Sequence, residues 1–111
     1  MKIIQEPIFF AELWKTKEID LGDILKIVID VNKQIIGVDA EMHADIEEKL
    51  LDTGSRQESL WGANLIPNEN AYDIEFTSFI NIRPGQGNRA MEVQDAELRK
   101  QIKHILNELI K

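Results

Sequence analysis

The sequence predicts an α+β domain with a mostly antiparallel sheet of at least four strands, helices packed on one face, and the order β-α-β-β-α-β-β-α. Three features predict this class: two β-branched segments separated by Asn32-Lys33, an alternating segment from Asp73 to Arg83, and an amphipathic C-terminal segment. The length of 111 residues suits one domain, so residues 1–111 are expected to fold as a unit.

The first half of the chain predicts a strand, a short helix and a hairpin. Residues Lys2 to Gln5 are β-prone, and Pro7 suits the first turn of a helix, because its fixed φ matches helical geometry. Ile24 to Val31 and Gln34 to Met42 are rich in β-branched residues on either side of a polar pair. We therefore expect an antiparallel hairpin here.

A second helix and a third strand follow. Asp45 and Glu48 have the spacing of a capping box, which predicts a helix from Asp45 through Leu51 that Gly54 ends. Residues Leu60 to Ile66 then predict a third strand, followed by a polar turn.

The last third predicts a strand, a loop and a helix. In the segment Asp73 to Arg83, apolar and polar positions alternate, which indicates a strand with one polar face. A loop from Pro84 to Arg89 follows. Asp95 is a good N-cap, and an apolar stripe at helical spacing continues from Leu98 to Leu109.

Composition limits the class of protein. The formal charge is −7, from 20 acidic and 13 basic residues, and this surplus disfavours nucleic-acid binding. Cysteine is absent, the N-terminal stretch lacks the pattern of a signal peptide, and no run approaches the ~20 apolar residues of a membrane span. We expect a soluble, cytoplasmic protein that does not associate with membranes.

Three ordered motifs stand out: His43-Ala44-Asp45, the stretch GSRQESLWGAN from Gly54 to Asn64, and INIRPGQGNR from Ile80 to Arg89. In this order they resemble a family of small uncharacterised prokaryotic proteins, a domain of unknown function with H-A-D, G-S-x-Q-x-x-L-W-G-x-N and I-N-I-R-P-x-x-G-N-R motifs. The resemblance implies no activity. It implies only which positions matter: His43, Ala44, Asp45, Ser55, Gln57, Leu60, Trp61, Gly62, Asn64, Asn81, Arg83, Pro84, Gly87, Asn88 and Arg89.

A first candidate site is metal binding by Glu41, His43 and Asp45. Residues two apart on a strand project side by side, so these three could hold one metal ion with mixed nitrogen and oxygen ligands. The alternative is structural: Glu41 is solvated, His43 ends a strand and Asp45 caps a helix.

A second candidate is the loop from Pro84 to Arg89. Arg83 and Arg89 could hold a carboxylate or phosphate while the glycines leave backbone donors accessible. The pattern is not that of a nucleotide P-loop. In the structural alternative, the arginines pair with acidic neighbours, for which the candidates are Asp30, Asp39, Glu41 and Asp45.

A third candidate set combines polar and aromatic residues between the second helix and the third strand: Ser55, Gln57, Trp61 and Asn64. A tryptophan can stack on a ligand. A tryptophan between Leu60 and Leu65 is also typical of a packed core or a subunit contact.

If both strand assignments hold, one polar face gathers Asp39, Glu41, His43, Asn81 and Arg83. This convergence favours a small anionic ligand bound under the Pro84 to Arg89 loop, with His43 as candidate catalytic base and the following binding residues: Glu41, His43, Asn64, Asn81, Arg83, Asn88 and Arg89. The alternatives are a homodimeric or partner-binding module and a metal-assisted hydrolase using His43. The sequence contains no reaction motif, so it decides neither for nor against catalysis and identifies no cofactor.

Overall fold

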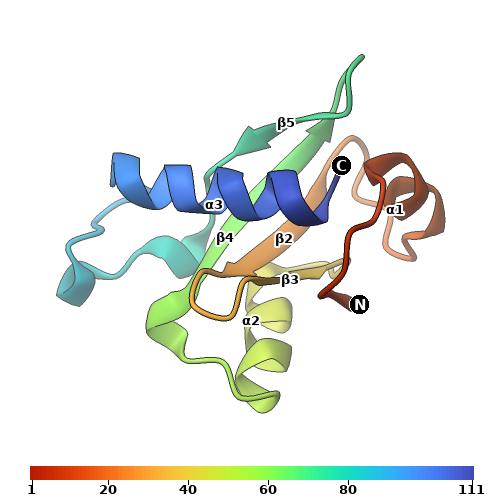
Figure 1. Ribbon diagram of the computed structural model, residues 1–111. Helices are drawn as coiled ribbons and strands as arrows, with labels where there is room; N and C mark the ends of the chain where they lie inside the picture. Colours follow the sequence, from red (N-terminus) through yellow and green to blue (C-terminus); the bar gives the residue numbers. More distant parts are fainter.

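The computed structural model describes residues 1–111 and confirms the α+β class and the predicted order of elements. Five antiparallel strands form one sheet in the order β1-β3-β2-β4-β5 (Figure 1). The strands are β1 (Lys2–Ile4), β2 (Leu25–Asp30), β3 (Ile35–Val38), β4 (Leu60–Pro67) and β5 (Tyr72–Glu75). The helices are α1 (Phe10–Thr16), α2 (His43–Asp52) and α3 (Ala96–Leu109), with short 3₁₀ turns at Gln57–Ser59, Phe79–Asn81 and Pro84–Gln86.

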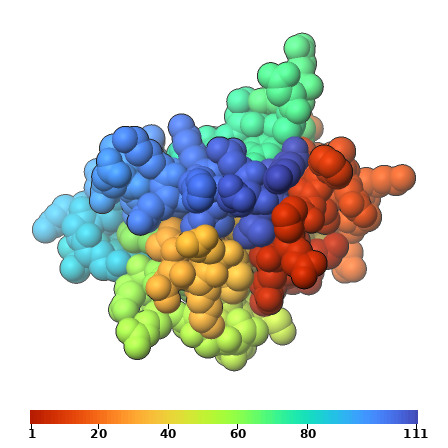
Figure 2. Space-filling view, in the orientation of Figure 1, coloured from red at the N-terminus to blue at the C-terminus, as the bar shows by residue number.

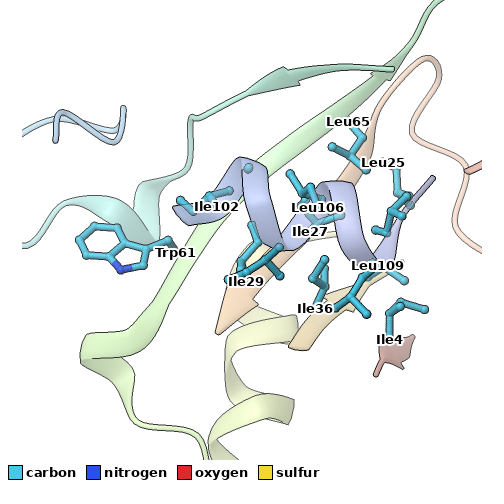
Figure 3. Packing of buried hydrophobic residues seen from close by; sticks show 14 of the residues in the cluster. Ile4, Leu25, Ile27, Ile29, Ile36, Trp61, Leu65, Ile102, Leu106 and Leu109 are labelled. Atoms are coloured by element: carbon cyan, nitrogen blue, oxygen red, sulfur yellow. The ribbon is translucent and has the colours of Figure 1, made fainter. Parts of the chain in front are cut away.

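The larger core lies between the sheet and the helices α1 and α3. Alternate residues of the central strands, such as Ile27 and Ile29, pack against Ile102 and Leu106 of α3 (Figure 3). Each such side chain contributes about 1.5–3 kcal/mol when fully buried. In Figure 1, α3 crosses this face of the sheet. The amphipathic stripe predicted for the last helix is therefore its contact with the sheet.

A smaller core lies on the opposite face, where α2 packs against β2 and β3. Val28 and Leu60 of the sheet contact Ile46 and Leu50 of α2. The helix approaches so closely that a Cβ built on Gly37 would overlap Ile46 Cγ2. The expectation that helices cover one face only is therefore wrong, because the narrow apolar stripe of α2 packs on the face that alternation marked as polar.

The β2–β3 hairpin is confirmed, but β3 is shorter than predicted. Strand β3 ends at Val38, since Asp39 has a φ of +71°, which no strand residue adopts. The carboxylate of Asp39 stabilises this bend by accepting hydrogen bonds from the backbone N–H groups of Glu18 and Ile19. Glu41 and His43 therefore do not continue the strand, and the predicted alternation of their side chains does not exist.

The predicted strand from Asp73 to Arg83 is also shorter, because β5 ends at Glu75. Phe76 turns into the larger core, and Ser78 caps a 3₁₀ turn by accepting a hydrogen bond from the backbone N–H of Ile80. Alternation beyond Glu75 thus reflects residues buried in two different cores rather than the two faces of one strand. Asn81 and Arg83 leave the sheet before the loop begins.

Of the three helix ends predicted from capping residues, the start of α3 and the end of α2 are confirmed, and the start of α2 is not. Asp95 caps α3 by accepting a hydrogen bond from Glu97 N, as predicted. Helix α2 begins at His43, not at Asp45, and its N-cap Met42 provides no side-chain hydrogen bond, so the predicted capping box is wrong. Gly54 ends this helix with a φ of +103°, as predicted.

The two ends of the chain lie side by side. Ile8 and Ile110 form a parallel bridge, which places the N-terminal segment beside the end of α3 (Figure 2). None of the three helices is long and apolar enough to cross a membrane.

Candidate functional site

The motif residues meet around the middle of β4. The Asn81 carboxamide is fully buried and pairs with the backbone of Gly62: Gly62 N donates to Asn81 Oδ1 at 2.8 Å, and Asn81 Nδ2 donates to Gly62 O at 2.9 Å. Strand β5 does not reach Gly62, so this side chain replaces the missing neighbouring strand. Asn81 is thus a structural residue rather than the ligand contact that the sequence suggested.

Gly62 provides the space for two other side chains. A Cβ built on this residue would lie 2.7 Å from Ser78 Oγ and 3.2 Å from His43 Cδ2. Both side chains therefore rest on the glycine from the α2 side of the sheet. This contact explains why the motif has glycine between Trp61 and Ala63.

His43 is held in one orientation at the start of α2. Its Nε2 lies 2.8 Å from the carbonyl oxygen of Ala63, which only accepts, so Nε2 carries the proton and Nδ1 is unprotonated in the neutral ring. Burial lowers the pKa of His43 below its ordinary value, whereas the hydrogen bond to the Ala63 carbonyl opposes the shift; the Lys26 charge adds to the lowering, and the neighbouring Asn64 side chain acts against it. The ring is therefore neutral at pH 7.

Asn64 lies beside His43, so the structure brings these two predicted site residues together. Asn64 Nδ2 donates to Glu75 Oε1 at 2.8 Å and to the carbonyl of Thr77 at 3.4 Å. Its Oδ1 is buried and has no hydrogen-bond partner. On the neighbouring strand Lys26 is the register partner of Asn64.

The predicted metal ligands do not come together. Glu41 and Asp45 are both exposed, and Glu41 contributes only its carbonyl oxygen, which accepts from Lys26 Nζ at 2.8 Å. Nowhere do three His, Cys, Asp or Glu side chains gather as a metal-ligand group. The metal prediction failed because it assumed a strand where the chain turns into α2.

Arg83 is already paired inside the fold. Its guanidinium donates to Glu47 Oε2 at 3.2 Å, to the carbonyl of Gln57 at 2.6 Å and to the carbonyl of Ile80 at 3.0 Å. It also stacks over Trp61, with 4.7 Å from Cζ to the ring centroid. Only 10% of the Arg83 side chain is exposed. Desolvation lowers its pKa, and Glu47 opposes that shift.

Arg83 therefore pairs with an acidic residue inside the fold, as the structural alternative in the sequence analysis predicted, and its partner is Glu47. None of the four acids proposed as partners of the arginines pairs with either of them. Asp30 accepts from Ser55 Oγ at 2.6 Å and from the backbone of the β2–β3 turn, so Ser55 is buried and hydrogen-bonded within the fold. Asp39 accepts from the backbone of Glu18 and Ile19, and Glu41 and Asp45 are exposed.

The two remaining candidates in the loop, Asn88 and Arg89, differ in whether their side chains are already hydrogen-bonded. Asn88 is buried, and its Nδ2 donates to the carbonyls of Asn81, Ala90 and Glu92 while its Oδ1 accepts from Gln94 N, so it closes the loop. Arg89 is exposed, and its guanidinium makes no hydrogen bond or ion pair. The predicted pair of anion-binding arginines does not form.

A cleft lies between the Pro84 to Arg89 loop and the first turns of α3. Its volume is about 400 Å³. Eleven residues line it: Val31, Glu58, Trp61, Gln86, Gly87, Asn88, Gln94, Asp95, Glu97, Leu98 and Gln101. Three of these side chains are apolar and three are carboxylates, and no lysine or arginine is among them. The volume falls in the range of small-ligand sites, roughly 300–1,000 Å³.

Sequence reasoning missed several of these residues. Glu47, Lys26 and Glu75 belong to no motif and meet the motif residues only through strand pairing and helix packing. The position of the cleft could be predicted in part from the sequence, because the predicted N-cap at Asp95 places the start of a helix shortly after the loop. Gln94 and Glu97 flank that cap and could have been named.

Comparison with known proteins gives one finding. No curated protein and no solved structure matches the chain. A family model described as "Protein of unknown function (DUF5674)" matches residues 2–109. The match covers nearly the whole chain, in agreement with the resemblance that the three motifs indicated, and the protein belongs to this family of unknown function.

Proposed function

We propose that the protein binds a small organic cation in the cleft between the Pro84 to Arg89 loop and α3. The observation that carries this proposal is the cleft itself, about 400 Å³ in volume and lined by three apolar side chains together with polar and acidic ones. Trp61, Val31 and Leu98 supply the apolar part. Such a combination of apolar area and a few polar groups is typical of small-molecule sites.

The acidic residues that line the cleft favour a positively charged ligand. Glu58, Asp95 and Glu97 line the cleft and no basic residue is among the lining, although Arg56 lies 3.6 Å from Glu58 and Lys100 lies 3.5 Å from Glu97 in exposed ion pairs; the chain as a whole carries a formal charge of −7. Arg83 is engaged by Glu47, and Arg89 lies outside the lining. The proposal keeps the loop as one wall of a binding site, but replaces the expected anion with a cation.

The walls are held by hydrogen bonds before any ligand arrives. Gln86 Nε2 donates to the carbonyl of Glu58 at 3.1 Å, which joins the loop to the start of β4. Gln94 Oε1 accepts from Arg89 N at 3.1 Å, which joins the loop to the segment before α3. A preformed site lowers the entropy lost on binding, because fewer side chains must be ordered.

Three probes of similar length and different charge test the proposal by isothermal titration at low salt: putrescine, 1,4-butanediol and succinate. We expect putrescine to bind, butanediol to bind more weakly and succinate not to bind. Glu58→Gln and Glu97→Gln are each expected to weaken putrescine binding about threefold to tenfold, because each removes one exposed charge.

The matched control is Glu48→Gln on α2, which removes the same charge from an exposed position outside the cleft. General attraction to an acidic protein would weaken binding equally in all three variants. That result, or an absence of putrescine binding, contradicts the proposal.

A second candidate function is association with another protein or with a second copy of the chain. One observation favours it: Phe9 is 69% exposed and, with Phe10 and Trp14, lines a groove of about 500 Å³ between α1 and the turn after β4. Large exposed aromatic groups are typical of contact surfaces. Light scattering of the wild type and Phe9→Ser tests this function, since association through the groove is expected to be lost in the variant.

A further inference from the structure

Strand β1 lies at one edge of the sheet, where it pairs with β3 and has no neighbour on its outer side (Figure 1). A hollow of about 540 Å³ runs along this segment and is lined by residues 3–8 and Glu12. An open strand edge presents backbone N–H and C=O groups to which a further strand can bind. The outer side of β1 is therefore a surface that fits an extended segment.

The hydrogen bonds inside the sheet show which backbone groups point to this edge. Asp39 N donates to the carbonyl of Lys26, and Val31 N donates to the carbonyl of Ser59. Even-numbered residues of β2 therefore bond to β3 and odd-numbered residues bond to β4, because successive residues of a strand direct their backbone groups to opposite sides. In β3 the odd-numbered residues bond to β2, and the even-numbered residues bond to β1.

Two residues of the N-terminal segment direct their backbone groups outwards. Lys2 and Ile4 are the register partners of even-numbered residues of β3 and bond to them. Ile3 and Gln5 therefore direct their N–H and carbonyl groups to the open edge, and Gln5 forms no backbone hydrogen bond within the chain. The Ile4 side chain is buried in the larger core, whereas the side chains of Lys2 and Glu6 are exposed.

The charges along this edge are self-complementary. When two such strands pair antiparallel, the residues that point outwards must face each other, so Ile3 of each copy can face Gln5 of the other. This register is centred on Ile4, and it places Lys2 of each copy opposite Glu6 of the other. These are non-hydrogen-bonded pairs, in which facing side chains lie closest and opposite charges stabilise the pairing.

The other edge of the sheet lacks this complementarity. Strand β5 has the sequence YDIE, with two acids and no basic residue. Antiparallel pairing of two β5 strands centred on Ile74 would place Asp73 opposite Glu75, and pairing centred on Asp73 would place this residue opposite its own copy. Like charges directly opposite each other are destabilising. The charge pattern therefore favours β1 as the edge that meets a second copy.

We propose that a second copy of this chain binds to the open edge of β1, with the two β1 strands antiparallel and centred on Ile4. The two five-stranded sheets then become one continuous sheet. Each facing pair of Ile3 and Gln5 exchanges two backbone hydrogen bonds, and the ion pairs of Lys2 with Glu6 select the register. No residue of β1 lines the cleft proposed to bind a cation, so the two proposals stand independently.

Sedimentation equilibrium at low salt tests the dimer. We expect the wild type to dimerise and added salt to weaken the dimer, because salt screens exposed ion pairs. Lys2→Glu and Glu6→Lys are each expected to weaken it about tenfold, because each substitution turns both ion pairs into repulsive pairs. An equimolar mixture of these two variants is expected to dimerise again, since position 2 of each variant then faces the opposite charge at position 6 of the other.

The matched controls are Lys49→Glu and Glu48→Lys on α2, which make the same changes of charge at exposed positions away from this edge. Both are expected to dimerise as the wild type does. Gln5→Pro removes an outward N–H, keeps the bonds between β1 and β3, and is expected to abolish the dimer.

Hydrogen exchange of the wild type provides a test that needs no substitution. The amides of Ile3 and Gln5 are expected to exchange rapidly in dilute protein and slowly at high concentration, because only the dimer gives them acceptors.

The proposal is overturned if the wild type is monomeric, if the controls weaken the dimer as much as Lys2→Glu and Glu6→Lys do, or if the mixture of these two variants does not dimerise. Exchange at Ile3 and Gln5 that is independent of concentration also overturns it. Association through the groove at Phe9 gives a different result, because it would be lost in Phe9→Ser and retained in Gln5→Pro.

Discussion

The carboxamide of Asn81 pairs with the backbone N–H and C=O of Gly62, at 2.8 and 2.9 Å, in the way that a neighbouring strand would. Asn81 also donates to the carbonyl of Met91 at 3.0 Å, so one side chain joins β4 to the segments before and after the Pro84 to Arg89 loop. The loop is thereby attached to the centre of the sheet.

Asn81→Ala is expected to destabilise the protein by about 2–4 kcal/mol, because it leaves a buried N–H and buried carbonyls without partners. Urea denaturation measures this change in the free energy of unfolding. Asn107→Ala, on the exposed side of α3, is the control and is expected to change it by no more than about 0.5 kcal/mol. Equal effects of the two substitutions would show that the Gly62 pairing contributes little.

Gly62→Ala is expected to cost about 1–3 kcal/mol, because the new methyl group overlaps Ser78 at 2.6 Å. Adding Ser78→Gly removes the overlapping atoms and is expected to recover part of that loss. Gly85→Ala is a matched control, since a Cβ built there meets no atom within 4 Å. Thermal denaturation of these three variants and of Ser78→Gly alone checks these values, and additive effects of the two substitutions at positions 62 and 78 would contradict the contact.

Arg83→Ala is expected to destabilise the protein by about 3–5 kcal/mol, because it leaves the mostly buried Glu47 carboxylate without a partner and uncovers Trp61. Arg83→Lys is expected to recover little, since an ammonium cannot reproduce the three bonds of the guanidinium fork. The exposed Arg89 provides the control: Arg89→Ala is expected to be nearly neutral. Urea denaturation distinguishes this structural role from a ligand contact, which would leave stability unchanged.

The lowered pKa of His43 predicts a loss of stability on acidification. Below its ordinary value of 6.5, the unfolded chain binds a proton that the folded chain does not, so stability falls as pH falls through 6.5 towards the lower folded pKa. The loss is at most about 1.4 kcal/mol per pH unit for one group.

The measurement is the free energy of unfolding at pH 8, 6.5 and 5.5 for wild type and His43→Gln. Subtracting the variant removes the contributions of other groups, and the difference is expected to shrink as pH falls. His104→Gln, on the exposed face of α3, is expected to keep the wild-type dependence. A wild-type dependence retained in His43→Gln would assign the effect to other residues.

The order of elements could be predicted from the sequence because it depends on local features. The strand-like stretch from Leu60 to Ile66, the β-branched hairpin and the apolar stripe of the last helix can each be recognised from residues close together in the chain. Asp95 and Gly54 marked helix ends correctly. Alternation failed from Phe76 to Arg83, because Phe76 packs in the larger core whereas Ile80 packs against the smaller one.

The candidate site could be predicted only in part. The motifs drew attention to His43 and Asn64, which do lie together, and to the loop that lines the cleft. They did not show that Arg83 pairs with Glu47, since a residue's charge does not identify its partner. Nor did they identify Lys26 and Glu75, which reach Asn64 through strand pairing.

The sequence by itself therefore determined the α+β class and the order of its elements, and it drew attention to the motif positions. Only the tertiary structure decided what those positions do: Asn81 completes β4, Gly62 makes room for His43, and Arg83 is bound internally. The reason is physical. Secondary structure follows from neighbours along the chain, whereas a polar side chain's role depends on which distant groups satisfy its hydrogen bonds and charge once the chain is folded.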